Sequence, residues 1–191
     1  MPQVSMPDRS RKAITLVLGG VRSGKSRYVQ TLAAGVSPVA FVATARPSDS
    51  DEEMRLKIER HRAERPPEWH TIEEPLHIDR VLVEEGSNYR MLLVDCLTLY
   101  AANLLDAERG NLIAVEERLQ CLYAALRSVP CSVALVSNEV GSGIVPVSPE
   151  GRKYRDLLGE INQRVASAAE NVLLMVAGLP LVLKGVAEVR P

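Results

Sequence analysis

The sequence lacks long apolar runs and a strong charge of either sign, and each absence excludes a class of protein. No stretch reaches the roughly 18 uninterrupted apolar residues that a membrane-spanning helix needs. The polar start MPQVSMPDRSRK has no apolar segment of a signal peptide, so we expect a cytoplasmic protein without a membrane span. With a formal net charge of -1 and no dense block of Lys and Arg, nucleic acid and anionic membranes are not expected as partners.

Cysteine is also scarce. The three cysteines, Cys96, Cys121 and Cys131, are an odd number, and their spacing matches no metal or redox motif. Each lies in an apolar segment, which predicts reduced thiols in the core. The 191 residues, 46% of them hydrophobic, suffice for one compact domain. We expect that domain over residues 13–191, after a disordered polar extension over residues 1–12.

Five short apolar runs predict buried strands, because they are rich in β-branched residues and hydrophobic on both faces. They are residues 13–19, 39–45, 91–96, 132–138 and 171–178. Between these runs, apolar residues recur at helical spacing, which predicts helices at residues 25–34, 51–63, 76–85, 111–127 and 152–169. This alternation is typical of an α/β fold with a mostly parallel sheet and helices on both faces. After a Gly-Leu-Pro turn, residues 181–184 are expected to return as an antiparallel edge strand.

The segment GGVRSGKS fits the phosphate-loop pattern G-x-x-x-x-G-K-[ST] and lies between a predicted strand and a predicted helix. Glycines let backbone amides turn toward phosphate oxygens, and the helix N-terminus adds partial positive charge. Lys25 would reach the β- and γ-phosphates, and the Ser26 hydroxyl would ligate Mg²⁺. The segment therefore predicts a nucleoside triphosphate site made of Gly19, Gly20, Val21, Arg22, Ser23, Gly24, Lys25 and Ser26.

A second residue that holds the Mg²⁺ is expected at the end of another strand. Asp95 follows the apolar run MLLV, which is the position of a Walker-B acid. An Asp at this place can equally cap a helix, and the segment DCLT does precede one. A regulatory GTPase would need a guanine-reading Asn-Lys-x-Asp motif, and the nearest string is SNEVG. That class is therefore disfavoured.

The charged segment after the second strand reads as a helix over residues 51–62. Met54, Ile58 and His61 fall on one face of it. A lone histidine on such a face is more often a hydrogen-bonded core residue than a catalyst. Basic side chains nearby favour a phosphate site instead, and they are Arg55, Arg60, Arg62 and Arg65.

Several motifs together resemble one family. The segments GGVRSGKSRYV, FVATA, DEEMRLKIERHRAERPPEWHTIEEP, LLVDCLTLYAANLL, VSNEVGSGIVPVSPEGRKYRDLLGEINQRVA and AGLPLVLK occur in the order and approximate spacing of the bifunctional adenosylcobinamide kinase and adenosylcobinamide-phosphate guanylyltransferase family. NEVGSGIVP and the H-x-x-x-R-P-x-x-W spacing in HRAERPPEW are the most specific of them. The resemblance spans residues 14–184 and implies a P-loop NTPase-type, RecA-like fold.

The resemblance implies two reactions of cobalamin biosynthesis. A nucleoside triphosphate, ATP or GTP, first phosphorylates adenosylcobinamide. GTP then transfers GMP to adenosylcobinamide phosphate through a guanylylated histidine, giving adenosylcobinamide-GDP and pyrophosphate. His61 occupies the histidine position of the motif, whereas His70 and His77 do not. A neutral imidazole has a free lone pair, so its attack on the α-phosphorus needs no separate base.

The resemblance also implies further nucleotide contacts, from Thr44, Ala45, Arg62, Ala63, Glu64, Arg65, Glu73 and Asp95. It implies a ring-like homotrimer. The loop NEVGSGIVPVSPEGRKYRD offers Asn138, Glu139, Arg152 and Arg155, and it could hold the corrinoid or contact a second subunit. Two rival functions remain open: a monofunctional P-loop small-molecule kinase, and a GTP-dependent switch or assembly protein.

Overall fold

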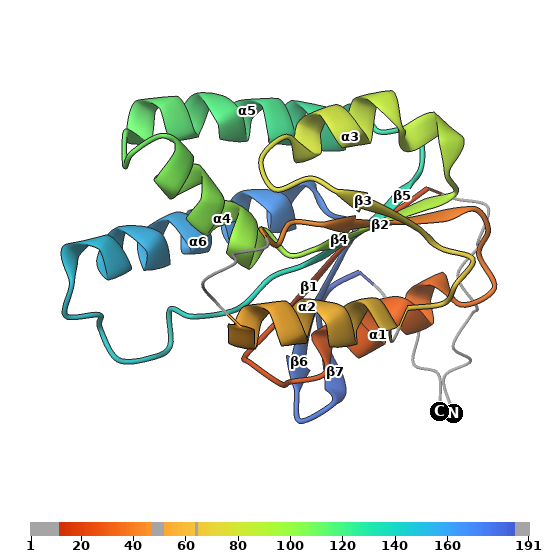
Figure 1. Cartoon of the computed structure of the whole chain (residues 1–191), viewed down its shortest axis with the longest axis horizontal. Helices are drawn as coiled ribbons and strands as arrows, with labels where there is room; N and C mark the ends of the chain where they lie inside the picture. Colours follow the sequence, from red (N-terminus) through yellow and green to blue (C-terminus); the bar gives the residue numbers. More distant parts are fainter. Residues whose placement is uncertain (1–11, 47–51, 64, 186–191) are drawn as a thin grey trace.

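The computed structural model describes residues 12–46, 52–63 and 65–185, which form a sheet with helices on both of its faces (Figure 1). The disordered extension predicted for residues 1–12 lies, apart from Lys12, outside the described residues. The strands are β1 (Ile14–Gly19), β2 (Val39–Ala43), β3 (His70–Glu73), β4 (Met91–Asp95), β5 (Ser132–Val136), β6 (Asn171–Val176) and β7 (Leu179–Lys184).

The strand order is β3-β2-β4-β5-β1-β6-β7. All neighbouring strands are parallel except β6 and β7, which form the expected antiparallel edge pair. Strand β5 lies between β1, which leads into the phosphate loop, and β4, which ends at Asp95. The predicted α/β, RecA-like fold with a mostly parallel sheet is confirmed.

Helices α1 (Lys25–Ala33) and α2 (Glu52–Ala63) lie on one side of the sheet, and the other helices lie on the opposite side (Figure 1). These are α3 (Ile78–Glu84), α4 (Leu97–Ala107), α5 (Leu112–Ser128) and α6 (Pro149–Ala168), with a short 3-10 helix, η1 (Gly86–Asn88), after α3. None of the described helices has the length and apolar character needed to cross a membrane.

Each face of the sheet has its own apolar core, and β4 contributes to both. Leu92 and Val94 pack with the helices of the α3–α6 side, whereas Met91 and Leu93 pack on the side of α1. Successive side chains of a strand point to opposite faces, so a strand covered on both sides must be apolar throughout. This is why the strand appears in the sequence as an uninterrupted apolar run.

Four features differ from the sequence-based expectations, and one of them is helix α4, which no predicted helical range covered although a helix was expected after DCLT. Strand β3 was not predicted, because its sequence HTIE contains no apolar run. In the structure this strand is only partly buried. Helix α6 begins before the predicted residue 152, because Ser148 caps it by accepting a hydrogen bond from the Gly151 amide and Pro149 fits its first turn. The prediction of three core thiols is wrong for Cys121, which lies on the exposed side of α5, although all three cysteines are free.

Candidate active site

The phosphate loop leaves β1 and enters α1 with the backbone geometry that glycine permits. Gly19 has a positive φ of 150°, which residues with a side chain rarely adopt. A Cβ at this position would also lie 2.6 Å from the carbonyl oxygen of Met175. Gly24 precedes α1 with φ 99°, a conformation that other residues rarely adopt. The loop therefore requires glycine at both positions to bring its amides to the start of α1.

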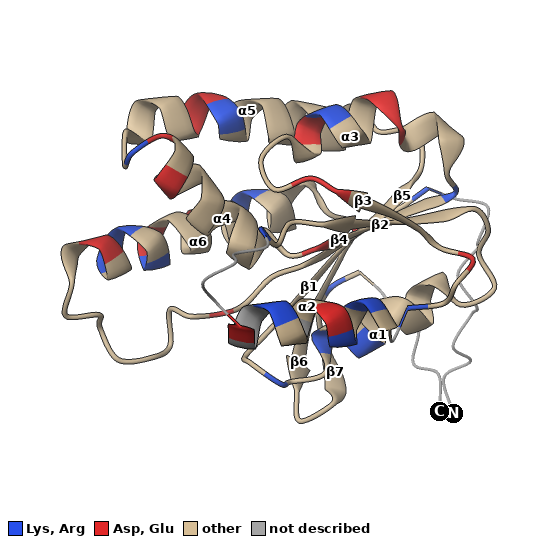
Figure 2. Ribbon diagram, viewed as in Figure 1, with Lys and Arg blue, Asp and Glu red and all other residues tan. Residues whose placement is uncertain are grey.

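Lys25 is buried at the first position of α1, with 8% of its surface exposed. Its Nζ donates a hydrogen bond of 2.5 Å to the Gly20 carbonyl oxygen. The ammonium group thus lies across the loop whose amides would surround a phosphate group. Lys and Arg residues lie on the loop before α1, on α1 and, among Glu residues, on α2 (Figure 2). The phosphate loop and Lys25 therefore favour an anionic ligand.

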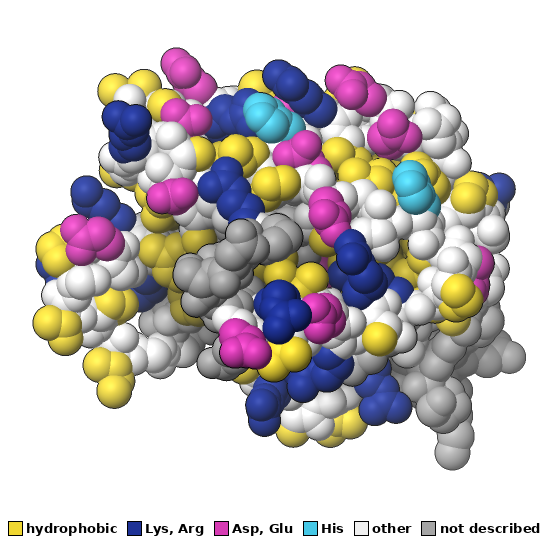
Figure 3. Space-filling model, in the orientation of Figure 1, with side chains coloured by type: hydrophobic (Ala, Val, Ile, Leu, Met, Phe, Trp, Pro, Cys, Tyr) yellow, Lys and Arg dark blue, Asp and Glu magenta, His cyan; other side chains and the backbone are white. Residues whose placement is uncertain are grey.

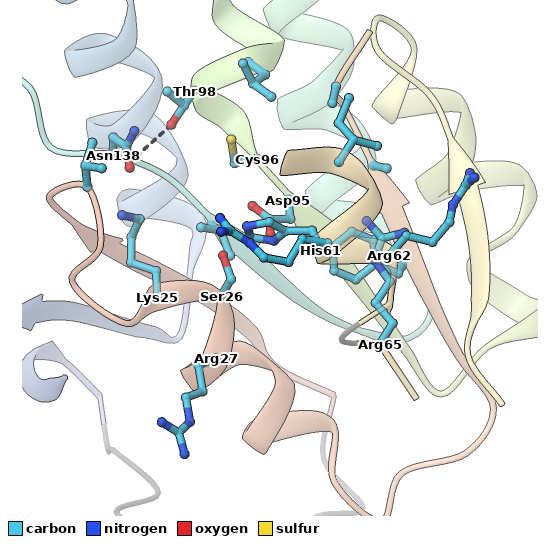
Figure 4. A pocket seen from close by; sticks show the side chains of 18 of the residues that line it. Lys25, Ser26, Arg27, His61, Arg62, Arg65, Asp95, Cys96, Thr98 and Asn138 are labelled. Atoms are coloured by element: carbon cyan, nitrogen blue, oxygen red, sulfur yellow. Dashed lines mark hydrogen bonds between the residues drawn. The ribbon is translucent and has the colours of Figure 1, made fainter. Parts of the chain in front are cut away.

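A cavity of about 750 Å³ opens at the carboxyl ends of β2, β4 and β5, between the phosphate loop and α2 (Figure 4). This is the edge at which open α/β sheets bind ligands. The structure brings twelve of the predicted site residues to its wall, namely Val21, Arg22, Ser23, Gly24, Lys25, Ser26, Ala45, His61, Arg62, Arg65, Glu73 and Asp95.

Ser26 and Asp95 meet in this cavity, from α1 and from the end of β4. Burial raises the pKa of the Asp95 carboxyl above its ordinary value. A hydrogen bond from Ser26 and the nearby His61, Arg65 and Lys25 act in the opposite direction. A hydroxyl and a carboxylate in contact beside a phosphate loop form the donor set that holds Mg²⁺ on a nucleotide. These two side chains therefore fit the predicted metal.

His61 lies in the last turn of α2, half-buried, and lines the cavity. Figure 4 shows it next to Asp95, and the pKa of that carboxyl responds to it. Ile58 of the same predicted face also lines the cavity. The side chain of Met54, the third residue of that face, is outside the described part of the structure. The face of α2 that carries His61 is thus turned to the cavity and not to an apolar core.

Two arginines follow His61 and are held differently. Arg62 forms an ion pair with Glu73 in which both side chains are more than half exposed, so the pair contributes little stability. The Arg65 guanidinium lies 3.7 Å above the Phe41 ring and donates to the Thr71 hydroxyl at 3.2 Å. Burial lowers the pKa of Arg65. Arg65 is therefore a fixed cation in the wall, whereas Arg62 can exchange Glu73 for a ligand.

Some predicted residues do not line the cavity: Gly19, Gly20, Thr44 and Ala63. Glu64 lies outside the described residues. Thr44 is fully buried, and its hydroxyl is bonded to the backbone of Cys96. His70 hydrogen-bonds the Tyr89 hydroxyl, and His77 lies 2.7 Å from Arg118 through its Nδ1, so neither faces the cavity.

The structure adds wall residues that were not predicted as nucleotide contacts. They include Arg27, Phe41, Cys96, Thr98 and Asn138, whereas Arg60, one of the arginines expected near a phosphate site, also lines the cavity. Thr98 and Asn138 could have been found from the topology, because they follow β4 and β5 at the ligand-binding edge of the sheet. Phe41 lies inside an apolar strand, and no pattern in the sequence distinguishes it from a core residue.

Comparison with known proteins identifies the family. A sequence model of the family described as cobinamide kinase / cobinamide phosphate guanyltransferase matches residues 15–183. The chain belongs to this family. The expected bifunctional kinase and guanylyltransferase family is therefore confirmed, and with it the assignment of the chain as a transferase of cobalamin biosynthesis.

Curated relatives are similar over nearly their whole length. The chain is 44% identical over 172 residues to the bifunctional adenosylcobalamin biosynthesis protein CobP of Pseudomonas aeruginosa, covering 89% of this chain and 96% of the relative. It is 38% identical over 180 residues to the bifunctional adenosylcobalamin biosynthesis protein CobU of Escherichia coli, covering 88% and 98%. The corresponding protein of Salmonella typhimurium is 37% identical over 180 residues.

Solved structures support the fold alone. An ATPase from the type III secretion system of pathogenic bacteria is similar with a TM-score of 0.54 and 13% identity, over 89% of this chain and 56% of that one. The protein PH0250 from Pyrococcus horikoshii OT3 is similar with a TM-score of 0.53 and 10% identity, over 92% and 88%.

Proposed function

We propose that the cavity carries out both reactions of the family and that the same phosphate loop serves both. In the first, a nucleoside triphosphate, ATP or GTP, phosphorylates the aminopropanol hydroxyl of adenosylcobinamide. In the second, GTP transfers GMP to adenosylcobinamide phosphate by way of His61. The observation that carries the proposal is that Lys25, Asp95 and His61, from three separate motifs, line one cavity.

In the kinase step the substrate hydroxyl oxygen forms a bond to the γ-phosphorus, and the bond from that phosphorus to the β–γ bridging oxygen breaks. The nucleoside diphosphate leaves with the electron pair, and the hydroxyl proton is released to water. Lys25 and the loop amides stabilise the charge that develops on the phosphate oxygens. Mg²⁺ held by Ser26 and, through water, by Asp95 would neutralise the same charge.

In the guanylyl step a ring nitrogen of His61 attacks the α-phosphorus, and pyrophosphate leaves into the phosphate loop. The phosphate oxygen of adenosylcobinamide phosphate then attacks the same phosphorus and releases His61, giving adenosylcobinamide-GDP. The half-buried position of His61 at a helix end, open to the cavity, suits such a covalent carrier. Arg62 and Arg65 would bind the nucleotide phosphates, and Glu73 and Ala45 would line the nucleotide site.

The proposal includes a cytoplasmic homotrimer. Free cysteines suit a reducing compartment. The loop between β5 and α6 exposes 98% of Ile144 and 97% of Val147, and Figure 3 shows apolar side chains projecting at the lower left, where this loop lies in Figure 1. Exposed apolar side chains grouped in this way favour a contact with another subunit.

The test is the intact mass of the protein after incubation with GTP and Mg²⁺ without corrinoid, under non-acidic conditions that preserve a phosphoramidate. We expect a GMP adduct on the wild type and on His70→Ala, whose histidine lies away from the cavity, and none on His61→Ala. An adduct on His61→Ala would overturn the role of His61. If the wild type carries none, and forms no adenosylcobinamide-GDP when adenosylcobinamide phosphate is added, the chain is a kinase alone.

A further inference from the structure

The segment that follows β5 is fixed by hydrogen bonds on every side. The Asn138 amide donates to the Thr98 hydroxyl at 2.9 Å, and the Asn138 carbonyl accepts from the Asn162 side chain at 3.0 Å. The amide of Ser137 donates to Val17 at 3.0 Å, and that of Glu139 to Gly19 at 3.2 Å. The backbone of Asn138 is thereby held against both the phosphate loop and the start of α4.

Two of these partners are polar groups inside the core. Asn162 of α6 has 6% of its surface exposed, and its Oδ1 accepts a 2.6 Å hydrogen bond from the fully buried Ser137 hydroxyl. Burying an amide and a hydroxyl is unfavourable unless both are hydrogen-bonded. The Asn162 Oδ1 accepts from the Ser137 hydroxyl, and its Nδ2 donates to the Asn138 carbonyl oxygen. The Asn162 side chain therefore holds residues 137 and 138 in place.

The side chain of Asn138, in contrast, is turned to the cavity. It lines the wall on the same side as Lys25, whereas His61 enters from α2 (Figure 4). Among the described residues no hydrogen bond to its carboxamide is found, so its NH2 group and its carbonyl oxygen face the ligand space. Since β5 lies between β1 and β4, its end lies between the phosphate loop and Asp95.

We propose that the Asn138 carboxamide binds the γ-phosphate of the triphosphate through its Nδ2, and that Thr98 and Asn162 are positioning residues for it. The inference rests on the proposed nucleotide site. A neutral amide neither takes the substrate proton nor replaces Lys25 as a counter-charge. It supplies one directed hydrogen bond to the group that is transferred in the kinase step. In the guanylyl step the same phosphate belongs to the leaving pyrophosphate, so the contact matters less there.

The first experiment compares two nucleotides on the same protein. Calorimetry would measure the affinity of Asn138→Asp for GDP and for a non-hydrolysable GTP analogue. The matched control is Asn111→Asp, at the exposed N-cap of α5, where aspartate caps as well as asparagine does. At position 138 aspartate preserves the shape and replaces the donor with a negative charge, so we expect a loss of about tenfold or more for the analogue. Affinity for GDP should change by less than about twofold, since GDP has no γ-phosphate.

Equal loss for both nucleotides, or no loss for either, in a variant with an unchanged thermal unfolding profile would overturn the contact with the γ-phosphate. Wild-type protein that binds neither nucleotide would overturn the proposed site itself, which is a different outcome. Where the wild type is active, Asn138→Ala should lower kcat of the kinase step by about 10²-fold and guanylyl transfer by less than about threefold. A similar loss of both activities would contradict the proposal.

The role of Thr98 is tested by a double-mutant cycle. Thr98→Val removes the acceptor for the Asn138 amide and should lower kcat of the kinase step by about tenfold, with the KM for the nucleotide little changed. Combined with Asn138→Ala it should add almost nothing, because it acts through Asn138. Additive losses would show that Thr98 acts independently and would overturn its assignment as a positioning residue.

Discussion

The hydroxyl of Thr44 is hydrogen-bonded to both backbone groups of Cys96. It donates to the Cys96 carbonyl oxygen at 2.8 Å and accepts from the Cys96 amide at 2.7 Å. The Thr44 amide also donates to the Asp95 carbonyl oxygen at 3.2 Å. The ends of β2 and β4 are therefore joined at the point where Asp95 enters the cavity, and Thr44 acts on the site through its backbone neighbours.

Thr44→Val is expected to destabilise the protein and to weaken both reactions. Valine has the same shape but leaves the two Cys96 groups without their partner, at a cost of about 1–3 kcal/mol for each buried group. Chemical denaturation would measure the loss, and Thr31→Val, at an exposed position of α1, should change the free energy of unfolding by less than about 0.5 kcal/mol. Unchanged stability of Thr44→Val would show that water replaces the hydroxyl.

Much of this organisation was predictable from the sequence, because it depends on local patterns. The phosphate loop, the strands β1, β2, β4, β5 and β6 and the position of Asp95 follow from glycine spacing and apolar runs. Strand β3 has neither signal. It forms because Ala40 to Ala43 of β2 offer a free edge, and its pairing is determined by tertiary structure.

The finer structure of the site was less predictable, because it depends on contacts between distant segments. Thr44 and Cys96 are 52 residues apart, and Asn138 and Asn162 are 24 apart. No single-sequence pattern reports that the Thr44 hydroxyl faces a backbone or that Arg65 lies over Phe41. Family resemblance suggested Thr44 as a nucleotide contact, and the structure shows its side chain engaged elsewhere.

Lys25→Ala should abolish both reactions, because the same phosphate loop would serve the kinase and the guanylyl steps. We expect a loss of about 10²–10³-fold or more in each, measured by separating the phosphorylated and guanylylated corrinoids. His61→Ala should lose only guanylyl transfer and retain phosphorylation. Equal loss of both activities in a folded His61→Ala protein would mean that the two roles are not separable.

Thiol labelling distinguishes the three cysteines. Burial raises the pKa of Cys96 to about 11, with the charge of Asp95 acting in the same direction, and burial also raises the pKa of Cys131. The reactive thiolate is therefore scarce at both positions at pH 8. Iodoacetamide should add one group, at the exposed Cys121, and none to Cys121→Ser. All three thiols should react in denaturant, whereas fast labelling of native Cys96 would contradict the assignment.

The exposed loop between β5 and α6 provides a test of the oligomer. Replacing Ile144 and Val147 together by serine removes apolar surface that no described residue covers, so it should leave the stability of the subunit unchanged. Light scattering should then report a fall from a trimer to a smaller species. If the trimer persists and the KM for the corrinoid rises instead, the loop binds substrate and the subunit contact lies elsewhere.

Asp95→Asn should make the protein more stable and inactive. Because burial raises the folded-state pKa of this carboxyl, its ionised form destabilises the native state above that pKa, and the penalty disappears as the pH falls toward the unfolded value. The neutral amide avoids the penalty, so Tm should rise at pH 7, by about 2–4 °C for each kcal/mol gained, and the gain should shrink at pH 5.

The control for this experiment is Asp106→Asn, at a side chain that is 82% exposed, where no measurable change is expected. A lower Tm for Asp95→Asn at pH 7 would show that attraction to Lys25 and Arg65 outweighs burial. The expected gain has a functional cause. A carboxylate that is to hold the proposed metal beside a nucleotide would have to remain charged although burial disfavours its charge, and the protein would tolerate that instability until its ligand binds.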